Sequence, residues 1–241
     1  MTNMTNMTNP STPYQDVRVE AINAFFGKVY RWMAAGLILT AVAAHVTASS
    51  PTLLEMIFGS RVTLIALIVI ELGLVFGISA GINRISAATA STLFVVYSLL
   101  NGVTLSSVLL IYTGESVFSA FLTTAGMFGA MSVYGLYTKR DLTSWGSFLM
   151  MGLFGLIIAS LVNLFLKSSA TQFVLTIFGI VIFMGLTAWD TQMLRNMGES
   201  FGDRIEGDET VSKLAVLGAL RLYLDFVNIF LYLLQFMGRR R

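Results

Sequence analysis

The chain has 241 residues, of which 56% are hydrophobic and only 12% are charged, and its mean hydropathy is +0.77. Soluble domains carry roughly 25% charged residues, so this composition excludes a soluble globular protein and predicts that much of the surface faces a lipid bilayer. The net charge of +2 gives no reason to expect a nucleic-acid partner, and the absence of Cys excludes disulfides and thiolate metal sites.

The chain begins with a polar, low-complexity segment that repeats Met-Thr-Asn three times before Pro10 and Pro13. We expect residues 1–28 to form a disordered tail, because such a segment has little apolar surface to bury. It lacks the basic start and short apolar core of a secretory signal. The first apolar run begins near Val29 and six more follow, so all of them are predicted to be retained as spans.

Seven apolar runs have the length that a membrane-spanning helix requires. A hydrocarbon core about 30 Å thick takes about 20 residues of helix. The runs cover residues 29–48, 62–82, 86–112, 117–137, 145–166, 172–192 and 214–237. The expected fold is therefore an all-α membrane protein, with a seven-helix transmembrane bundle over residues 29–238 and a basic C-terminal tail at 239–241.

The segment 193–213 is the longest polar connection and is interpreted as an aqueous loop. It holds five acidic residues among three basic ones, in a spacing that does not match a helix-loop-helix calcium site. These residues are Glu199, Asp203, Glu206, Asp208 and Glu209, with Arg195, Arg204 and Lys213.

The basic residues beside the spans indicate the orientation in a cell inner membrane. The N-terminal side holds nine: Arg18, Lys28, Arg31, Arg84, Lys139, Arg140, Arg195, Arg204 and Lys213. The other side holds five: Arg61, Lys167, Arg239, Arg240 and Arg241. The positive-inside rule therefore favours a cytoplasmic N-terminus. The three C-terminal arginines are discordant, and they would join the inner side if the last apolar run were re-entrant.

Three glycines in the second span, Gly73, Gly77 and Gly81, are spaced four apart. This spacing predicts a smooth ridge that packs closely against another helix. The same stretch imitates the G-x-S-x-G elbow of serine hydrolases around Ser79, but that elbow requires a strand-turn-helix context. The only candidate base, His45, belongs to another span, so the sequence indicates neither an enzyme nor a cofactor.

Four ionisable residues are expected at membrane depth: Glu71, Asp190, Arg221 and Asp225. A charge at the centre of a transmembrane helix costs about 2.5 to 3.5 kcal/mol, so these side chains are expected to face the bundle interior, water or one another. The last span also carries a polar stripe at helical spacing. The stripe consists of Gly218, Arg221, Asp225, Asn228, Tyr232 and Gln235. A peripheral helix would expose it to lipid, so the C-terminal helix is predicted to be central.

Asp190 near the end of the sixth span would reach Asp225 if the last two helices pack side by side. Two carboxyls that share a site do not both ionise cheaply, so such a pair would share a proton and titrate as one unit. This arrangement is typical of a proton-operated switch. The alternative is that Arg221, one turn before Asp225, neutralises that carboxylate within the helix as a structural ion pair. The spacing leaves both interpretations open.

Two motifs carry a resemblance to a known family: ALRLYLDFVNIFLYLLQFMG at 219–238 and TAWDTQ at 187–192. They resemble the Bax inhibitor-1 family, also called the transmembrane Bax inhibitor motif family, in its bacterial YccA-like branch, over about residues 20–238. The resemblance implies a seven-helix bundle with a central last helix and a calcium-permeable leak that depends on pH through two aspartates. These correspond to Asp190 and Asp225, which would also hold calcium transiently.

The chain departs from the family pattern at two positions. Trp189 replaces a common Tyr, and Arg221 stands where small or neutral polar residues are usual, so a cation beside Asp225 would move or abolish the proton switch. The resemblance also implies an arginine near the end of the second span as a partner for Asp190, and Arg84 is the candidate. Glu71, Arg84, Arg221 and Asn228 are thus the expected pore-lining or tuning residues.

The leading hypothesis is a pH-sensitive passive cation leak, with calcium suggested by the resemblance, since the polar interior offers the oxygen ligands that hard cations prefer. The residues alone support protons or sodium equally. The alternative is an interaction protein that modulates a membrane protease or another membrane complex, which gives a membrane protein partner besides lipid and cations. A proton-coupled transporter is less favoured because no internal inverted repeat is evident.

Overall fold

The computed structural model describes residues 13–201 and 208–241, with side chains from residue 20 onward. The described part contains eight helices, and seven of them are long and apolar enough to cross a membrane. They are α1 (Pro13–Ala48), α2 (Pro51–Phe58), α3 (Arg61–Gly81), α4 (Ala87–Ile111), α5 (Gly114–Tyr137), α6 (Thr143–Leu166), α7 (Ser169–Ser200) and α8 (Glu209–Met237). The predicted all-α bundle of seven spans is confirmed, and the short α2 is the one helix that does not span.

Polar caps fix where several spans begin. The side chains of Ser86, Thr113 and Ser168 each accept a hydrogen bond from the backbone N–H three residues later, which satisfies one free donor of α4, α5 and α7 respectively. At the other end of α6, Lys167 adopts a left-handed conformation with φ 51° and stops the helix. The beginnings of α4, α5 and α7 and the end of α6 are therefore sharply defined.

The first helix starts before the membrane span, so the expectation of a disordered tail over residues 1–28 is wrong for residues 13–28. Within this extension Phe25 is almost fully buried, and its ring packs edge-on against Phe201 at 5.2 Å. Apolar residues at helical spacing give the extension a face that packs against the end of α7. This face does not form a continuous apolar run of membrane-spanning length, so hydropathy does not reveal it. Residues 1–12 lie outside the described residues.

The polar connection before the last span is also shorter than residues 193–213, because α7 continues to Ser200 and α8 begins at Glu209. Arg195 explains part of this extension: its guanidinium donates to the carbonyl oxygen of Leu136 at 2.9 Å and lies 3.5 Å from a Glu199 oxygen. The end of α7 is thereby tied to the end of α5. Of the expected loop residues, Asp203, Arg204 and Glu206 lie outside the described residues.

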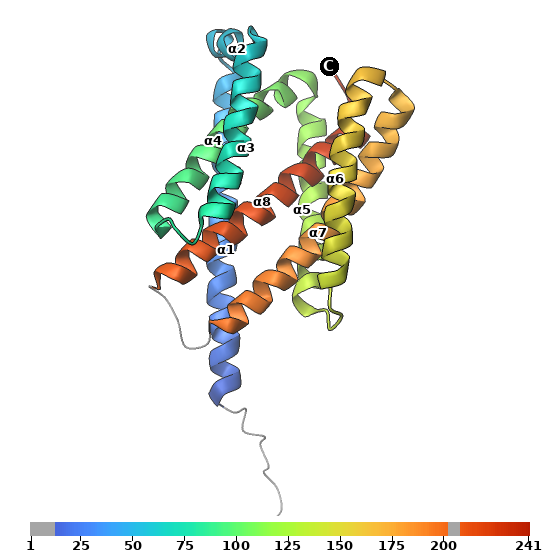
Figure 1. Ribbon diagram of the computed structural model, residues 1–241. Helices are drawn as coiled ribbons and strands as arrows, with labels where there is room; N and C mark the ends of the chain where they lie inside the picture. The colour runs from blue at the N-terminus through green and yellow to red at the C-terminus, as the bar shows by residue number, and fades with distance from the viewer. Residues whose placement is uncertain (1–12, 202–207) are drawn as a thin grey trace, which may run out of the picture.

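The C-terminal helix is central, as predicted. Figure 1 shows α8 running obliquely through the middle of the bundle, and it packs against α1, α3, α4, α5 and α7. In its most apolar 18-residue stretch 67% of residues are buried, against 11–39% in the corresponding stretches of the other six spans. The helix that carries the polar stripe is thus the span most shielded from lipid.

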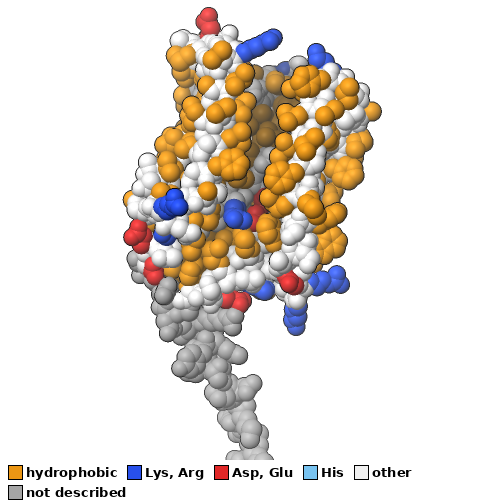
Figure 2. Space-filling model, in the orientation of Figure 1, with side chains coloured by type: hydrophobic (Ala, Val, Ile, Leu, Met, Phe, Trp, Pro, Cys, Tyr) orange, Lys and Arg blue, Asp and Glu red, His pale blue; other side chains and the backbone are white. Residues whose placement is uncertain are grey.

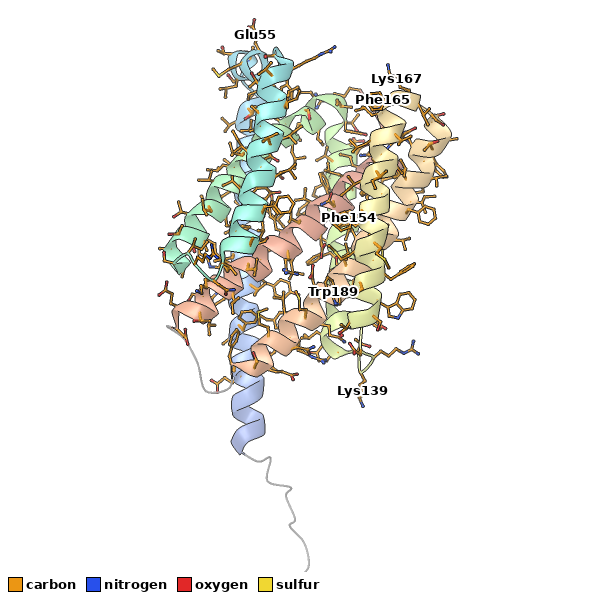
Figure 3. The ribbon with its side chains drawn as sticks, in the orientation of Figure 1. Glu55, Lys139, Phe154, Phe165, Lys167 and Trp189 are labelled. Carbon is orange, nitrogen blue, oxygen red and sulfur yellow. The ribbon has the colours of Figure 1, made fainter. Side chains whose placement is uncertain are left out.

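The two ends of the described chain lie at opposite ends of the bundle (Figure 1). The α8 helix is continuous over 29 residues, so the last apolar run is a full span and not a re-entrant segment. Charged side chains mark the two ends in Figure 3, with Lys139 at the N-terminal end and Glu55 and Lys167 at the other. The C-terminal arginines therefore lie on the side opposite the N-terminus.

The predicted glycine ridge of α3 does not pack within the chain, and that expectation is wrong. A Cβ added at Gly73 or Gly77 would meet no atom within 4 Å, and one at Gly81 would only graze Ile85 at 4.0 Å. Gly73 and Gly77 are exposed, whereas the buried residues of α3 are Glu71 and Ile78. Since α3 is peripheral, its ridge faces the lipid side.

Helices approach each other closely at other glycines instead. Substitution of Gly102 tests the close packing of α4 against α1. A Cβ there would lie 2.4 Å from the backbone oxygen of Thr40 in α1, a contact that backbone cannot easily relieve. We expect Gly102→Ala to destabilise the protein by about 1–3 kcal/mol through overpacking. Thermal unfolding in detergent measures this, and Gly77→Ala is the matched control with an unchanged melting temperature. Equal melting temperatures for the two variants would contradict the α1–α4 packing.

Candidate functional site: a charged triad between α7 and α8

The polar stripe of α8 faces α7 along most of its length. Tyr232 lies over Gly179, where an added Cβ would come within 2.6 Å of the tyrosine ring. Near the end of the stripe, Gln172 of α7 donates a side-chain hydrogen bond of 3.0 Å to Gln235. The two antiparallel helices thus bring their polar residues together, as the side-by-side packing of the last two spans required.

At the centre of this contact lie Asp190, Arg221 and Asp225, which we name the charged triad. Asp190 and Asp225 are 6% and 4% exposed, and their carboxyl groups interact directly. The Thr187 hydroxyl, one helical turn before Asp190, also faces Asp225. The Oδ2 atom of Asp225 is buried and has no hydrogen-bond partner among the described residues. The structure therefore joins the two aspartates that the sequence singled out.

Arg221 forms its ion pair across the contact between the two helices, with a residue of α7. Its Nη1 atom lies 3.3 Å from Oδ1 of Asp190 and 3.7 Å from the sulfur of Met193, both on α7. The arginine side chain is 37% exposed, whereas that of Asp190 is 9% exposed. The interpretation of Arg221 as a partner for Asp225 within α8 therefore misses its main contact, which joins α7 to α8.

The exposed part of Arg221 belongs to a face of α8 that its neighbours leave partly uncovered. Arg221, Leu224, Asn228 and Leu231 follow one another at helical spacing and are all intermediate in exposure. Figure 2 shows a hollow between α3 and α6, with a basic and an acidic side chain visible within it. The Asn228 amide donates to the backbone oxygen of Leu224 at 2.8 Å, so this predicted residue is bound within its own helix.

The Asp-Thr-Gln motif around Asp190 also anchors the connection between α5 and α6. The side chain of Gln192 accepts from the N–H of Leu142 and donates to the oxygen of Arg140, each at 2.8 Å. In the same connection, the side-chain and backbone hydrogen bonds from Thr143 hold the pKa of Asp141 below its ordinary value. Asp190 thus lies two residues from a side chain that ties α7 to the connection between α5 and α6.

Comparison with known proteins identifies the family. The sequence model described as "Inhibitor of apoptosis-promoting Bax1" matches residues 22–241. The chain belongs to the Bax inhibitor-1 family. It is 49% identical over 220 residues to the inner membrane protein YbhL of Escherichia coli K12, covering 91% of this chain and 93% of that protein. It is 48% identical over 219 residues to a Borreliella burgdorferi protein, with coverage of 91% and 93%. A Streptococcus pyogenes membrane protein is 36% identical over 229 residues, with coverage of 90% and 93%.

Membership confirms the predicted resemblance, and the structure adds a second polar cluster that the sequence did not reveal. Glu71 is buried and accepts hydrogen bonds from the amide of Asn101, at 3.2 Å, and from the hydroxyl of Thr104. The Tyr223 hydroxyl donates to the Asn101 oxygen at 2.9 Å and bonds the Thr40 hydroxyl at 2.6 Å. Glu71 is therefore part of a network joining α1, α3, α4 and α8, separate from the charged triad.

The remaining predicted residues lie apart from the triad. Arg84 is exposed in the turn after α3, where its N–H bonds the oxygen of Gly81 at 2.8 Å, so the structure pairs Asp190 with Arg221 and not with Arg84. Among the described residues no three His, Cys, Asp or Glu side chains gather into a metal cluster. Since calcium takes six to eight oxygen ligands, transient calcium binding at Asp190 and Asp225 stays a prediction.

Proposed function

We propose that this Bax inhibitor-1 family member is a pH-sensitive passive cation leak, with calcium as the principal ion, gated by Asp190 and Asp225. One observation carries the proposal: two interacting carboxyls and a single guanidinium meet in the contact between the central helix and α7. Other supporting features are the burial of both aspartates and the partial exposure of Arg221 beside them.

The charge balance of the triad gives the gating direction. With one proton on the aspartate pair the triad is neutral, and the protonated carboxyl is able to donate a hydrogen bond to its neighbour. With no proton the triad carries a net negative charge in an environment of low dielectric, where repulsion between carboxylates is strong. Loss of the proton therefore weakens the contact between α7 and α8, and flux rises with pH.

The oxygen groups near the contact suit a hard cation. The Asp190 and Asp225 carboxylates, and the amide oxygen of Asn228 on the partly exposed face of α8, are ligands of the kind that calcium prefers. A deprotonated triad is also net negative, so it attracts the cation whose passage it allows. The specific choice of calcium over sodium rests on the family resemblance.

Purified protein in liposomes tests the proposal. Calcium entry is measured with an enclosed dye at a series of pH values, beside sodium and proton indicators and beside protein-free liposomes. We expect calcium flux that depends on the protein and increases with pH. Absence of protein-dependent flux of any of the three ions would reject the leak and leave the interaction-protein alternative as the better explanation.

We further propose that the N-terminus faces the cytoplasm of a bacterial inner membrane, the membrane named for YbhL. Because the chain has no Cys, single cysteines report their side cleanly. In intact spheroplasts, Lys167→Cys is expected to react with a membrane-impermeant maleimide, whereas Lys139→Cys reacts only after lysis. The reverse labelling pattern would show that the N-terminus lies outside.

A further inference from the structure

An apolar cavity of about 330 Å³ lies between α1, α4, α5 and α8. It borders the face of α8 opposite the charged triad, and its walls include Leu37, Leu105, Val117, Phe121, Phe226 and Phe230. Figure 1 shows α4 and α5 diverging from their shared turn, and they hardly touch along their lengths. Phe118, which also lines the cavity, is 63% exposed, so the cavity opens between these helices toward the lipid.

A second, more polar pocket of about 250 Å³ adjoins the cavity toward the membrane surface. The two share Leu109, Gly114 and Val117 as lining residues. The polar pocket adds His45, Ser49, Tyr112 and Arg241, which come from the end of α1, the end of α4 and the C-terminal segment. Together they form one site with an apolar inner part and a polar, cationic outer part.

The C-terminal segment is fixed in place beside this outer part. The N–H of Arg241 donates to the oxygen of Ile111 at 2.9 Å, and the oxygen of Arg239 accepts from the N–H of Thr113 at 3.1 Å. The N–H of Arg239 also donates to the Ser116 hydroxyl at 2.9 Å. These hydrogen bonds hold the backbone of the C-terminal segment against the turn between α4 and α5. They thereby fix the position of Arg241 in the wall of the polar pocket.

No acidic side chain in the described part of the protein pairs with the charges of this segment. Arg239, Arg240 and Arg241 are exposed, and none forms an ion pair with a described acidic residue. They are also the arginines that the positive-inside rule leaves unexplained on the side opposite the N-terminus. An anionic group at the membrane surface would account for both observations.

We propose that this two-part pocket binds an anionic phospholipid of the bilayer, with its phosphate beside Arg241 and one acyl chain in the cavity between α4 and α5. The cavity volume is within the range of ligand pockets, and its apolar walls suit a hydrocarbon chain. The surface-level arginines attract an anionic headgroup. The site is independent of the proposed cation leak.

Native mass spectrometry of the full chain in detergent tests the site with phosphatidylglycerol and phosphatidylcholine of identical acyl chains. The wild type is expected to retain one phosphatidylglycerol in preference to phosphatidylcholine. Gly114→Leu places bulk where the two pockets join, and an added Cβ there meets no atom within 4 Å, so we expect the variant to fold. This variant is expected to weaken the binding of both phospholipids about tenfold or more. Arg241→Gln is expected to weaken the binding of phosphatidylglycerol about fivefold and to leave the binding of phosphatidylcholine unchanged.

Two matched variants control these measurements. Gly155→Leu adds the same bulk at an exposed glycine of α6 whose Cβ also meets nothing, and Lys167→Gln removes a cation on the same membrane side. Both are expected to bind phosphatidylglycerol as the wild type does. Wild-type binding in Gly114→Leu would overturn the assigned cavity. Equal binding of the two phospholipids by the wild type, or retention of a free fatty acid in their place, would overturn the anionic phospholipid as the occupant.

Discussion

Asp225→Asn is expected to remove most of the pH dependence of calcium flux while the protein stays folded. Asn has nearly the shape of Asp and carries no titrating proton, and in this variant the 3.3 Å ion pair between Asp190 and Arg221 remains in place. The triad is then neutral at every working pH, so nothing drives α7 and α8 apart. Flux in liposomes at about pH 6 and about pH 8 is expected to agree within about twofold.

Asp190→Asn is expected to flatten the same profile but also to lower the melting temperature, because Arg221 loses its ion-pair partner on α7. The double variant should add little to the flux effect of either single change, since the pair titrates as one unit. Asp141→Asn, which changes an exposed carboxyl outside the spans, is the control and should keep the wild-type profile. If both triad variants respond to pH as the wild type does, the aspartates are not the gate.

Hydropathy and helical spacing predicted the spans well because both are properties of a single helix facing lipid. The fourth span, for example, was expected at 117–137 and forms α5 over Gly114–Tyr137. The spacing of the α8 stripe predicted its central place, because polar groups at membrane depth require partners and only neighbouring helices supply them. The Asp190–Asp225 contact followed from the same reasoning once the last two spans were taken as neighbours.

The errors concern relations between helices, which spacing within one helix does not determine. The glycines of α3 make a smooth face, but which neighbour would use it depends on the whole bundle, and the structure turns that face toward lipid. The close glycine contacts occur at Gly102 and Gly135, which lie on α4 and α5 opposite the backbones of α1 and α7. Hydropathy does not predict the N-terminal extension of α1, because its apolar face is shorter than a membrane-spanning run.

The Glu71 network shows a further limit of sequence reasoning. Burial cost predicted that Glu71 must have partners, but Asn101, Thr104 and Tyr223 lie far from it along the chain. The available signal was Asn101 itself, an amide within an apolar run that also requires a partner inside the bundle. Matching one polar group to another across helices requires the three-dimensional arrangement, as it does for Arg221 and Asp190.

Arg221→Ser is expected to shift the midpoint of the flux profile to higher pH by about one unit or more. Arg221 contacts Asp190 directly and stabilises the state in which the aspartate pair has lost its proton. Without the guanidinium, that state leaves an uncompensated negative pair in the bundle, so the proton is held to higher pH. A shift of one pH unit corresponds to about 1.4 kcal/mol. This is only part of the Coulomb energy that a cation supplies at this distance in a partly exposed position.

The measurement has to separate this tuning role from a purely structural ion pair, because both lower stability when Arg221 is removed. Melting temperature in detergent and the flux midpoint are therefore recorded for the same preparations. Arg221→Lys keeps the positive charge but loses the planar guanidinium, so it is expected to restore a midpoint near that of the wild type even if the melting temperature stays low. A lowered melting temperature in Arg221→Ser with an unmoved flux midpoint would make Arg221 a structural partner of Asp190 only. A midpoint that shifts equally in Arg221→Lys and Arg221→Ser would show that hydrogen-bond geometry, and not the charge of Arg221, sets the pH at which the helices separate.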